Sequence, residues 1–291
     1  MNKMNTGNLK VAIQKSGRLS EKSLELIEES GIKLTQEGKL KLVSVSHNFP
    51  VELLFLRDDD IPQYVADKVA DIGIVGENEV LEKGKPVDII DRLGFGKCRL
   101  SLAIPQSIEY NGLSFFKGKK IATSYPGILK KFLDKQRLDA EIHEISGSVE
   151  IAPGIGLADA IFDIVSSGST LISNRLKEVE VVCHSEAVVI ANRDLPEAKK
   201  AILEKLLFRI HAVLSARNNK YILLNAPNDN LDKIVEILPG MKSPTVMPLA
   251  EKGWSSLHSV VNENDFWDII EKLKELGAQG ILVIPIEKMI V

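Results

Sequence analysis

The stretch of this sequence with the clearest chemical meaning is the loop Asp163-Ile-Val-Ser-Ser-Gly-Ser-Thr170. It follows an apolar run with the pattern of a strand, Ala160–Val165, and a helical pattern begins after Gly168, so its N–H groups should point outward at a helix N-terminus. Gly168 lets the backbone approach a ligand closely. Further hydroxyl donors are Ser166, Ser167, Ser169 and Thr170. The loop predicts a nest for one phosphate group; an ordinary turn rich in Ser and Gly is the alternative.

Two carboxylates accompany this loop. Asp163 stands at the end of the strand, where it could accept hydrogen bonds from ribose hydroxyls or touch a bound Mg²⁺. Glu150 precedes it and could place a second carboxylate beside the same sugar. A pair of carboxylates suits a diol or a metal-bound diphosphate, although Glu150 alone could equally be a solvated surface residue.

Basic residues follow two apolar strands near the N-terminus. Lys15 and Arg18 come after the run Leu9–Gln14, and Arg57 comes directly after Val51–Leu56. Ligands of an α/β sheet bind beyond the carboxyl ends of its strands. The three cations could therefore meet phosphates at one rim of a sheet, whereas any one of them alone could be a solvated turn residue.

Tyr125 lies in Thr123-Ser124-Tyr125-Pro126, which ends a strand and opens a helix. Its ring could stack on a base, or it could simply pack within a capping turn. The sequence has no G-x-x-x-x-G-K-[ST] and no G-x-G-x-x-G, so neither a Walker loop nor a dinucleotide fingerprint explains phosphate binding. It also offers no convincing Ser-His-Asp or Cys-His arrangement for nucleophilic catalysis.

The elements that would position these residues alternate between short strands and amphipathic helices, which predicts mostly parallel sheets with helices on both faces. Residues 105–118 interrupt the pattern, and a second αβ set follows them. The apolar run Val179–Ala191 could return the chain to the first lobe. We expect an α/β core with two lobes and a cleft, in the manner of periplasmic binding proteins. Lobe I would comprise residues 1–105 and 185–217, and lobe II residues 106–184.

The remaining residues, 218–291, give a separate pattern. Strand and helix signals follow one another in the order βαββαβ, which is the ferredoxin-like (ACT-like) arrangement. Such modules often bind small regulators at an interface, but the fold alone does not establish that role.

Composition narrows the function classes. The 291 residues carry a formal charge of −3, so no overall basic field recruits nucleic acid. We found no apolar run long enough for a signal peptide or a membrane span, which predicts a cytoplasmic protein without a membrane partner. Cys98 and Cys183 stand apart and are expected to be reduced, and no close pair of histidines suggests a zinc site.

Taken together, the motifs resemble those of the ATP phosphoribosyltransferase family of histidine biosynthesis, in its long form. In the first two hundred residues the matching stretches are Lys15-Ser16-Gly17-Arg18-Leu19, Phe55-Leu56-Arg57, Leu93-Gly94-Phe95-Gly96-Lys97-Cys98-Arg99-Leu100, Thr123-Ser124-Tyr125-Pro126 and the run from Asp159 to Leu171. In the tail they are Gly240-Met241-Lys242-Ser243-Pro244-Thr245, the run from Gly277 to Val283, and the run from Pro285 to Ile290. The resemblance covers nearly the whole chain.

The resemblance implies a reaction and a set of sites. N1 of ATP would attack C1′ of 5-phosphoribosyl 1-diphosphate with Mg²⁺ present and release diphosphate. The sugar-phosphate site falls on the loop and Glu150, with Asp163 as a metal contact mainly through the diphosphate. Nucleotide contacts fall on Lys15, Arg18, Arg57 and Tyr125. The inhibitor histidine would bind between regulatory domains through Asn225, Met241, Thr245, Val260 and Gly280. A homo-oligomer, dimer to hexamer, without a separate regulatory subunit is expected.

The sequence departs from the family pattern at one place. The family commonly has Gly-x-Asp after the strand Asp71–Val75, whereas this chain has Gly76-Glu77-Asn78. Asn78 therefore leaves any carboxylate role at that position open. Three alternatives remain: a solute-binding module, a transcriptional regulator with the same effector fold, and a different phosphoribosyltransferase. A signal peptide would favour the first, a helix-turn-helix segment the second and a different acceptor the third.

Overall fold

The computed structural model describes residues 7–35, 42–238, 240 and 243–290. It contains three sheets, two of which lie in one compact unit that comprises residues 1–25 and 33–202. A second unit comprises residues 26–32 and 203–291 and contains the third sheet. We call the first two sheets with their helices lobe I and lobe II, and the third the C-terminal domain.

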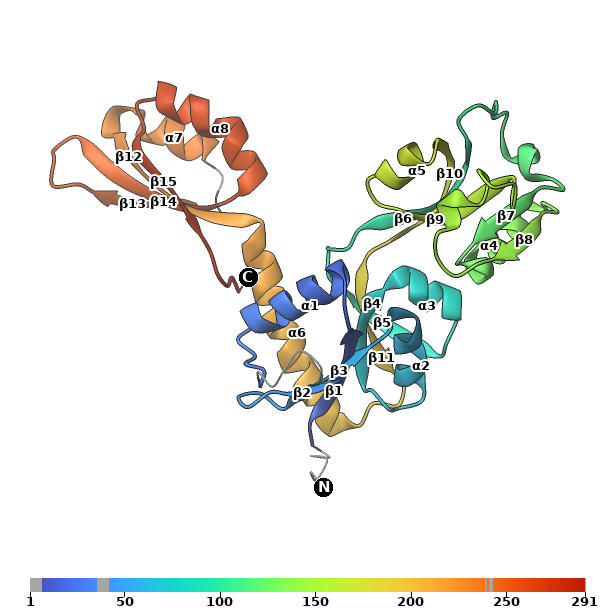
Figure 1. Ribbon diagram of the computed structural model, residues 1–291. Helices are drawn as coiled ribbons and strands as arrows, with labels where there is room; N and C mark the ends of the chain where they lie inside the picture. The colour runs from blue at the N-terminus through green and yellow to red at the C-terminus, as the bar shows by residue number, and fades with distance from the viewer. Residues whose placement is uncertain (1–6, 36–41, 239, 241–242, 291) are drawn as a thin grey trace. The chain divides into compact units, whose positions relative to one another are not determined.

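Lobe I is built on a six-stranded sheet (Figure 1). In sheet order its strands are β2 (Val43–Val45), β3 (Val51–Leu56), β1 (Leu9–Gln14), β4 (Ile72–Gly76), β11 (Ala187–Asn192) and β5 (Val87–Arg92). Strands β3, β1 and β4 are parallel, whereas β11 runs antiparallel to both of its neighbours. All six residues of β11 are buried, as expected for a central strand with both faces covered.

The helices that accompany lobe I are short: η1 (Asp58–Asp60), α2 (Ile61–Ala66) and α3 (Glu77–Lys83). The longer helices α1 (Arg18–Glu29) and α6 (Glu197–Arg217) each contain residues of both compact units. Ile61 and Val65 of α2 pack with Val188 and Ile190 of β11 in one apolar core.

Lobe II is a five-stranded sheet with a separate core on each face. Its strands, in sheet order, are β10 (Leu176–Ser185), β6 (Cys98–Pro105), β9 (Ala160–Val165), β7 (Lys120–Thr123) and β8 (Glu141–Glu144). Its helices are η2 (Leu113–Phe116), α4 (Pro126–Gln136), η3 (Val149–Ile151) and α5 (Ser169–Ser173). Phe162 packs with Leu129 of α4 on one face, and Ile161 packs with Leu171 of α5 on the other. This is the doubly covered sheet that the sequence predicts.

The boundary between the lobes differs from the prediction. We expected lobe I to continue to residue 105, but β6 pairs with β9 and β10 in the sheet of lobe II. The run predicted as one strand, Val179–Ala191, is divided between β10 in lobe II and β11 in lobe I. Since β11 in lobe I and β6 in lobe II each run antiparallel to both of their neighbours, both sheets are mixed. A uniform apolar run does not reveal which sheet each half joins.

The two crossings between the lobes are joined by hydrogen bonds. Leu93 N–H donates to the Ala187 carbonyl (2.9 Å), and Ala187 N–H donates to the Phe95 carbonyl (2.9 Å). Gly94 N–H donates to the Glu186 carboxylate at 3.0 Å. The two segments therefore form a short paired ribbon.

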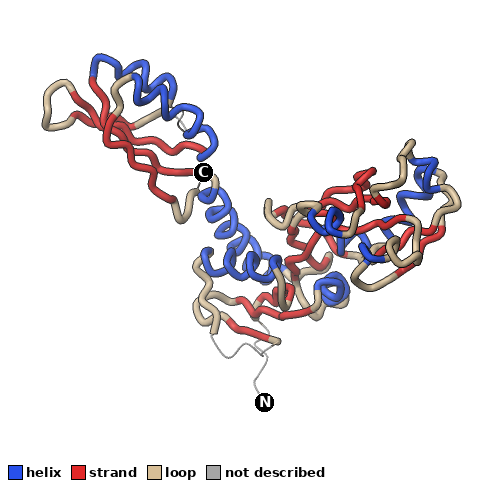
Figure 2. Tube along the Cα trace, turned by 45° about the horizontal axis from the view of Figure 1, so that its top comes forward, coloured by secondary structure: helices blue, strands red, loops and turns tan. Residues whose placement is uncertain are grey.

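The C-terminal domain has a four-stranded antiparallel sheet with its two α-helices on one face (Figures 1 and 2). Its strands, in sheet order, are β13 (Thr245–Pro248), β14 (Trp254–Asn262), β12 (Asn219–Pro227) and β15 (Gln279–Pro285), and its helices are η4 (Asn228–Asn230), α7 (Leu231–Ile237) and α8 (Glu263–Glu275). Asn262 caps α8 by accepting a hydrogen bond from Asn264 N–H (3.1 Å). The sequential and spatial orders together are ferredoxin-like, which confirms that part of the fold prediction.

Candidate active site

A pocket of about 410 Å³ brings residues of both lobes together. Strand ends and the segments that follow them supply its walls. The lining residues are Gln14, Arg18, Leu19, Lys22, Asp58, Gly76, Asn78, Glu79, Gly96, Lys97, Cys98, Tyr125, Ile164 and Ser166. Three predicted site residues, Arg18, Tyr125 and Ser166, are among them.

The predicted phosphate loop lies between a strand and a short helix, as the sequence predicts. It connects β9 to α5, and Gly168 at the start of α5 has φ 82° and ψ −1°, a left-handed conformation that favours glycine. The first N–H groups of a helix have no partner within it, so those of α5 can receive an anion. Ser166, Ser167, Ser169 and Thr170 are all exposed. Ser167 and Ser169 also join through their hydroxyls at 3.0 Å.

The loop is held at its start by an ion pair between Arg99 and Glu178, neither of which was a predicted site residue. Arg99 on β6 holds Glu178 on β10 through two hydrogen bonds, Nε to Oε1 and Nη2 to Oε2, both 2.5 Å. Arg99 Nη1 donates to the Ser166 carbonyl at 3.2 Å. Ser101 donates to Glu178 at 2.6 Å, and the hydrogen bonds from Arg99 hold the pKa of Glu178 below its usual value. Arg99 therefore fixes the start of the loop.

Asp163 and Glu150 lie near enough to influence each other. Burial raises the pKa of Asp163 to about 6, a hydrogen bond from Ile164 N–H (2.7 Å) lowers it, and the charge of Glu150 raises it further. Within the described residues, no three His, Cys, Asp or Glu side chains form a group that could hold a metal ion. Because the two carboxylates repel each other, a cation bound beside them would be stabilised.

Three residues of the pocket, Asn78, Glu79 and Tyr125, form a polar cluster with Ser185. Of these four, the sequence predicted only Tyr125 as a site residue. Asn78 and Glu79 lie at the start of α3 and are each only 6% exposed. The Asn78 amide donates to Glu79 Oε1 (2.9 Å) and to the Tyr125 hydroxyl (3.3 Å), and it accepts from Ser185 Oγ (2.9 Å). The Tyr125 hydroxyl also lies close enough to the Glu79 carboxylate to lower its pKa. The cluster crosses from lobe I to lobe II.

Gly76 leaves room for the Asn78 side chain of this cluster. A Cβ on Gly76 would lie 2.3 Å from Asn78 Oδ1, so the absence of a side chain at position 76 leaves room for the amide. Position 78 carries the amide that orients its neighbours, and the carboxylate lies one residue later, at Glu79.

Burial raises the pKa of Glu79 to about 7. The charges of Asp58 and Asp59 raise it as well, while Tyr125 and Lys83 lower it. Burial, reinforced by the charges of Glu79, Asp163 and Asp58, raises the pKa of the Tyr125 phenol. This end of the pocket is therefore acidic and poorly solvated, a setting that favours a ligand group able to donate hydrogen bonds or carry positive charge.

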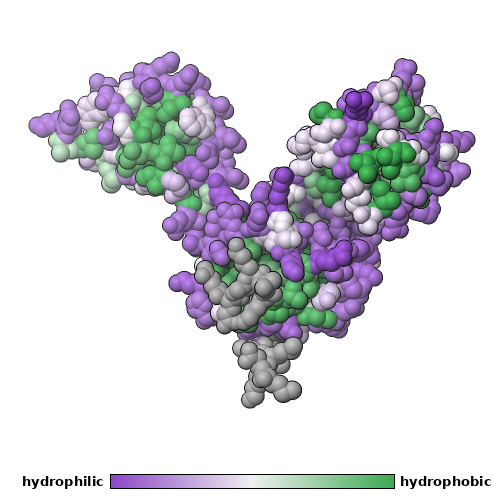
Figure 3. All heavy atoms as spheres, viewed as in Figure 1, coloured by the Kyte–Doolittle hydropathy of each residue, from purple (hydrophilic) through white to green (hydrophobic). Residues whose placement is uncertain are grey.

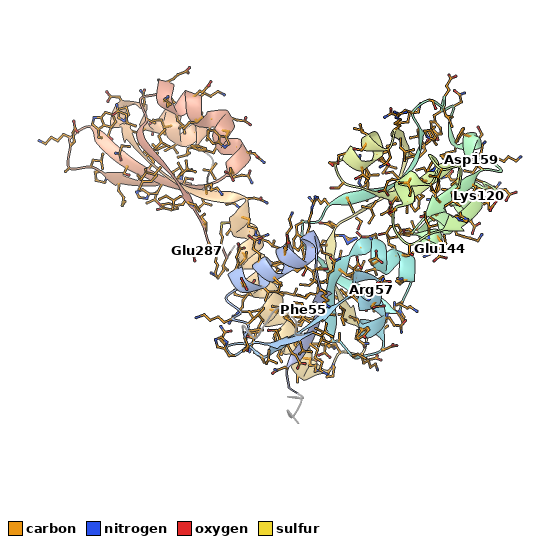
Figure 4. All side chains as sticks on the ribbon, viewed as in Figure 1. Phe55, Arg57, Lys120, Glu144, Asp159 and Glu287 are labelled. Carbon is orange, nitrogen blue, oxygen red and sulfur yellow. The ribbon has the colours of Figure 1, made fainter. Side chains whose placement is uncertain are left out.

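Basic side chains also line the pocket. Arg18 was predicted, whereas Lys22, one helical turn further along α1, and Lys97, on the ribbon between the lobes, were not. Lys15 and Arg57 are not among the lining residues. The Arg57 side chain follows β3 (Figure 4), is 79% exposed and pairs with Asp59 at 3.2 Å. Its predicted nucleotide contact remains a prediction.

In the C-terminal domain, Asn225, Thr245 and Val260 share one face of the sheet. Asn225 pairs with Ser256, Thr245 pairs with His258, and Val260 follows two residues later on the same strand, β14. Leu224 and Leu257 project to the opposite face, into the core beneath the helices. Gly280 adjoins Asn225, because a Cβ at Gly280 would lie 3.4 Å from the Asn225 amide nitrogen. Met241 lies outside the described residues.

Family models match most of the chain. The model described as "ATP phosphoribosyltransferase" matches residues 57–212, and the model described as "HisG, C-terminal domain" matches residues 216–288. The chain is 63% identical over 282 residues to an ATP phosphoribosyltransferase of Phocaeicola vulgatus, covering 97% of this chain and 99% of that protein. It is 64% identical over 283 residues to that of Bacteroides thetaiotaomicron, covering 97% and 100%. The chain belongs to the ATP phosphoribosyltransferase family.

A solved structure agrees with this assignment. An "ATP phosphoribosyl transferase (HisG:HisZ) complex" from Thermotoga maritima superposes with a TM-score of 0.60 and 29% identity, covering 70% of this chain and 98% of that one. The enzyme is a pentosyltransferase that uses ATP and 5-phosphoribosyl 1-diphosphate in the first step of histidine biosynthesis. In the part of the chain that the structure describes, every helix is too short or too polar to cross a lipid bilayer.

Proposed function

We propose that the two substrates meet in the pocket between the lobes. The loop Asp163–Thr170 binds the 5′-phosphate and ribose of phosphoribosyl diphosphate, with Glu150 and Asp163 beside the sugar. The adenine of ATP lies at Tyr125, and its phosphates extend toward Arg18, with Lys15 and Arg57 as further contacts. One observation carries this arrangement: Ser166 of the loop lines the same pocket as Tyr125 and Arg18.

In this arrangement the reaction is a displacement at the anomeric carbon. The lone pair of adenine N1 forms the bond to C1′ while the bond from C1′ to the diphosphate oxygen breaks, and diphosphate leaves with that electron pair. The protein contributes by holding N1 in line with C1′ and by stabilising charge, so no covalent nucleophile is required. The loop fixes the sugar, and Arg99 fixes the loop.

Mg²⁺ is the cation that we propose for this site. Asp163, with Glu150 nearby, offers the oxygen ligands that Mg²⁺ prefers, and a cation beside them would relieve the mutual repulsion of these carboxylates. Held there mainly through the substrate diphosphate, the ion would neutralise charge on the leaving group.

The C-terminal domain is proposed to bind histidine and inhibit the enzyme. One face of the sheet carries Asn225, Thr245 and Val260, and Gly280 lies beside Asn225. Met241 is a further predicted contact. That face is also apolar: Tyr221, Leu282 and Ile284 are exposed hydrophobic residues on β12 and β15, and Figure 3 shows hydrophobic surface on this domain. An exposed patch of this kind suits contact between copies of the chain, in a dimer or hexamer of a cytoplasmic enzyme that carries its own regulatory domain.

A diphosphate-release assay tests the substrate arrangement. With ATP, phosphoribosyl diphosphate and Mg²⁺, the full chain should release diphosphate, and Tyr125→Leu should raise the KM for ATP while leaving the KM for phosphoribosyl diphosphate nearly unchanged. An unchanged KM for ATP would place the adenine elsewhere.

Histidine titrations test the regulatory role. Histidine should inhibit the full chain and leave the chain truncated after Arg217 insensitive, since the truncation removes the C-terminal domain. Asn225→Ala in the full chain is the finer test, because it should weaken inhibition without changing the rate in the absence of histidine. Equal inhibition of all three proteins would remove the regulatory role from this domain.

A further inference from the structure

The buried carboxylate of Glu79 has no assigned part in phosphoribosyl transfer. It lines the pocket and is 6% exposed, it accepts a hydrogen bond from the neutral amide of Asn78, and the neutral hydroxyl of Tyr125 lies close enough to affect its pKa. Burying a carboxylate among neutral partners costs stability. A ligand that donates a hydrogen bond to this carboxylate or carries positive charge would offset that cost.

The charges around Glu79 indicate which part of ATP can lie there. Asp58 and Asp59 of η1 add negative charge at this end of the pocket, and Asp163 acts on the adjoining Tyr125. Lys83, one turn further along α3, is the nearby cation whose charge acts on Glu79. The triphosphate would be repelled here and attracted instead toward the basic residues of the pocket, Arg18, Lys22 and Lys97. The adenine, which donates hydrogen bonds through its exocyclic amine, suits the acidic end.

The reaction itself creates positive charge on that base. When N1 gives its lone pair to C1′, the adenine becomes an N1-substituted cation whose charge is shared between N1 and the exocyclic nitrogen N6. A hydrogen bond from N6–H to a carboxylate therefore strengthens as the bond to C1′ forms. An interaction that is stronger in the transition state than in the bound substrate raises the rate.

We propose that Glu79 is a catalytic residue that accepts a hydrogen bond from N6 of ATP and stabilises the positive charge which N1 attack places on the adenine. Asn78 is its positioning residue, because its amide donates to both Glu79 and Tyr125 and is held in turn by Ser185. The N6 proton stays on nitrogen during the step. The inference rests on the adenine position proposed above.

The test crosses one protein variant with one substrate variant. Glu79→Gln keeps the size of the side chain but removes its charge, and purine riboside triphosphate keeps N1 but lacks the N6 amine. With ATP, kcat of Glu79→Gln should fall about 100-fold, the scale at which a single charge-stabilising group acts, with little change in KM. The matched control is Glu271→Gln, because the Glu271 side chain is exposed on α8 in the C-terminal domain. This variant should retain the wild-type rate.

The decisive quantity is the preference for ATP over the analogue, taken as the ratio of kcat/KM values. The wild type should prefer ATP, and Glu79→Gln should lose about tenfold or more of that preference, because each change removes the same interaction. An unchanged ratio would overturn the proposal. If Tyr125→Leu raises the KM for ATP while that ratio stays constant, the adenine position survives and only the role of Glu79 fails. If Tyr125→Leu leaves the KM unchanged, both fail.

A pH profile of the wild type gives a test that does not depend on folding of a variant. Because the carboxylate must be ionised and its pKa is about 7, kcat/KM with ATP should rise as pH increases through that value. This rise of kcat/KM with pH, the acidic limb of the profile, should be absent when the wild type uses purine riboside triphosphate. It should also be absent when Glu79→Gln uses ATP. Asn78→Ala removes a donor to the carboxylate and should move the limb to higher pH. Identical profiles for the two nucleotides would refute the inference.

Discussion

Replacement of Gly168 by valine tests whether the conformation of the phosphate loop, and not merely its composition, binds the sugar phosphate. The nearest atom to a Cβ built on Gly168 is Val165 Cγ1, at 4.0 Å, so a side chain meets open space and not a clash. The cost comes from the backbone: at φ 82° a non-glycine residue pays roughly 1–2 kcal/mol, and a β-branched residue pays more.

If the loop changes conformation to relieve that strain, its N–H groups will no longer point toward the phosphate. Since 1.4 kcal/mol corresponds to tenfold in affinity, the KM for phosphoribosyl diphosphate should rise about tenfold. The KM for ATP should change little. Gly168→Asn should lie between glycine and valine, because asparagine tolerates left-handed conformations better than most residues. Initial rates of diphosphate release at varied substrate concentrations measure these constants.

The matched control is Gly118→Val. Gly118 also has a positive φ, 68°, and open space around its Cβ position, and it lies in lobe II outside the loop and the pocket. Its replacement should lower the melting temperature without raising the KM. If Gly168→Val keeps the wild-type KM, or if both variants raise it equally, the loop does not bind through its conformation.

Two further changes test the supports of the site. Glu178→Gln weakens the hold of Arg99 on the loop and should raise the KM for phosphoribosyl diphosphate. Because the pKa of Glu178 is lowered from 4.5 in the folded protein, its stabilising contribution is present above that value and is lost as pH falls below it. The melting temperature of Glu178→Gln should therefore lie below that of the wild type at pH 7, with a gap that narrows below pH 4.5; a constant gap would contradict this linkage. Glu82→Ala removes the carboxylate that accepts from Gly127 N–H and Ile128 N–H, both at 2.8 Å, at the start of α4. It should lower the free energy of unfolding by about 1 kcal/mol in denaturant titrations, as loss of a helix cap does, and an unchanged free energy would show that these bonds contribute nothing.

Local pattern was sufficient to predict the strand, loop and helix around Gly168 and the ferredoxin-like domain. The loop combines a strand, a glycine and hydroxyl residues within eight positions, and these neighbours in sequence remain neighbours in space. The tail alternates strands and helices whose pairing follows the chain. In both cases the physical cause is local, so the sequence carries it.

Glu79 could not be predicted in the same way. Its partner Tyr125 is 46 positions away on the other lobe, and Ser185, which orients Asn78, is further still. Glu79 lies in α3, a helix that we did not predict, where an acidic residue has the signature of a solvated first turn. The predicted boundary between the lobes differs from the structure for a similar reason. Hydrophobicity shows that a strand is buried, but it does not show which sheet the strand joins.

The paired ribbon between the lobes limits how this core can move. Because the segments at Leu93–Phe95 and Glu186–Ala187 are hydrogen-bonded to each other, a rotation of one lobe relative to the other would bend both segments together. We expect such a rotation to bend the ribbon across its face, since bending within its plane would break these hydrogen bonds. Lys97 and Cys98 follow this ribbon after Gly96 and line the pocket, so a phosphate bound at Lys97 would lie close to the segments that such a rotation bends.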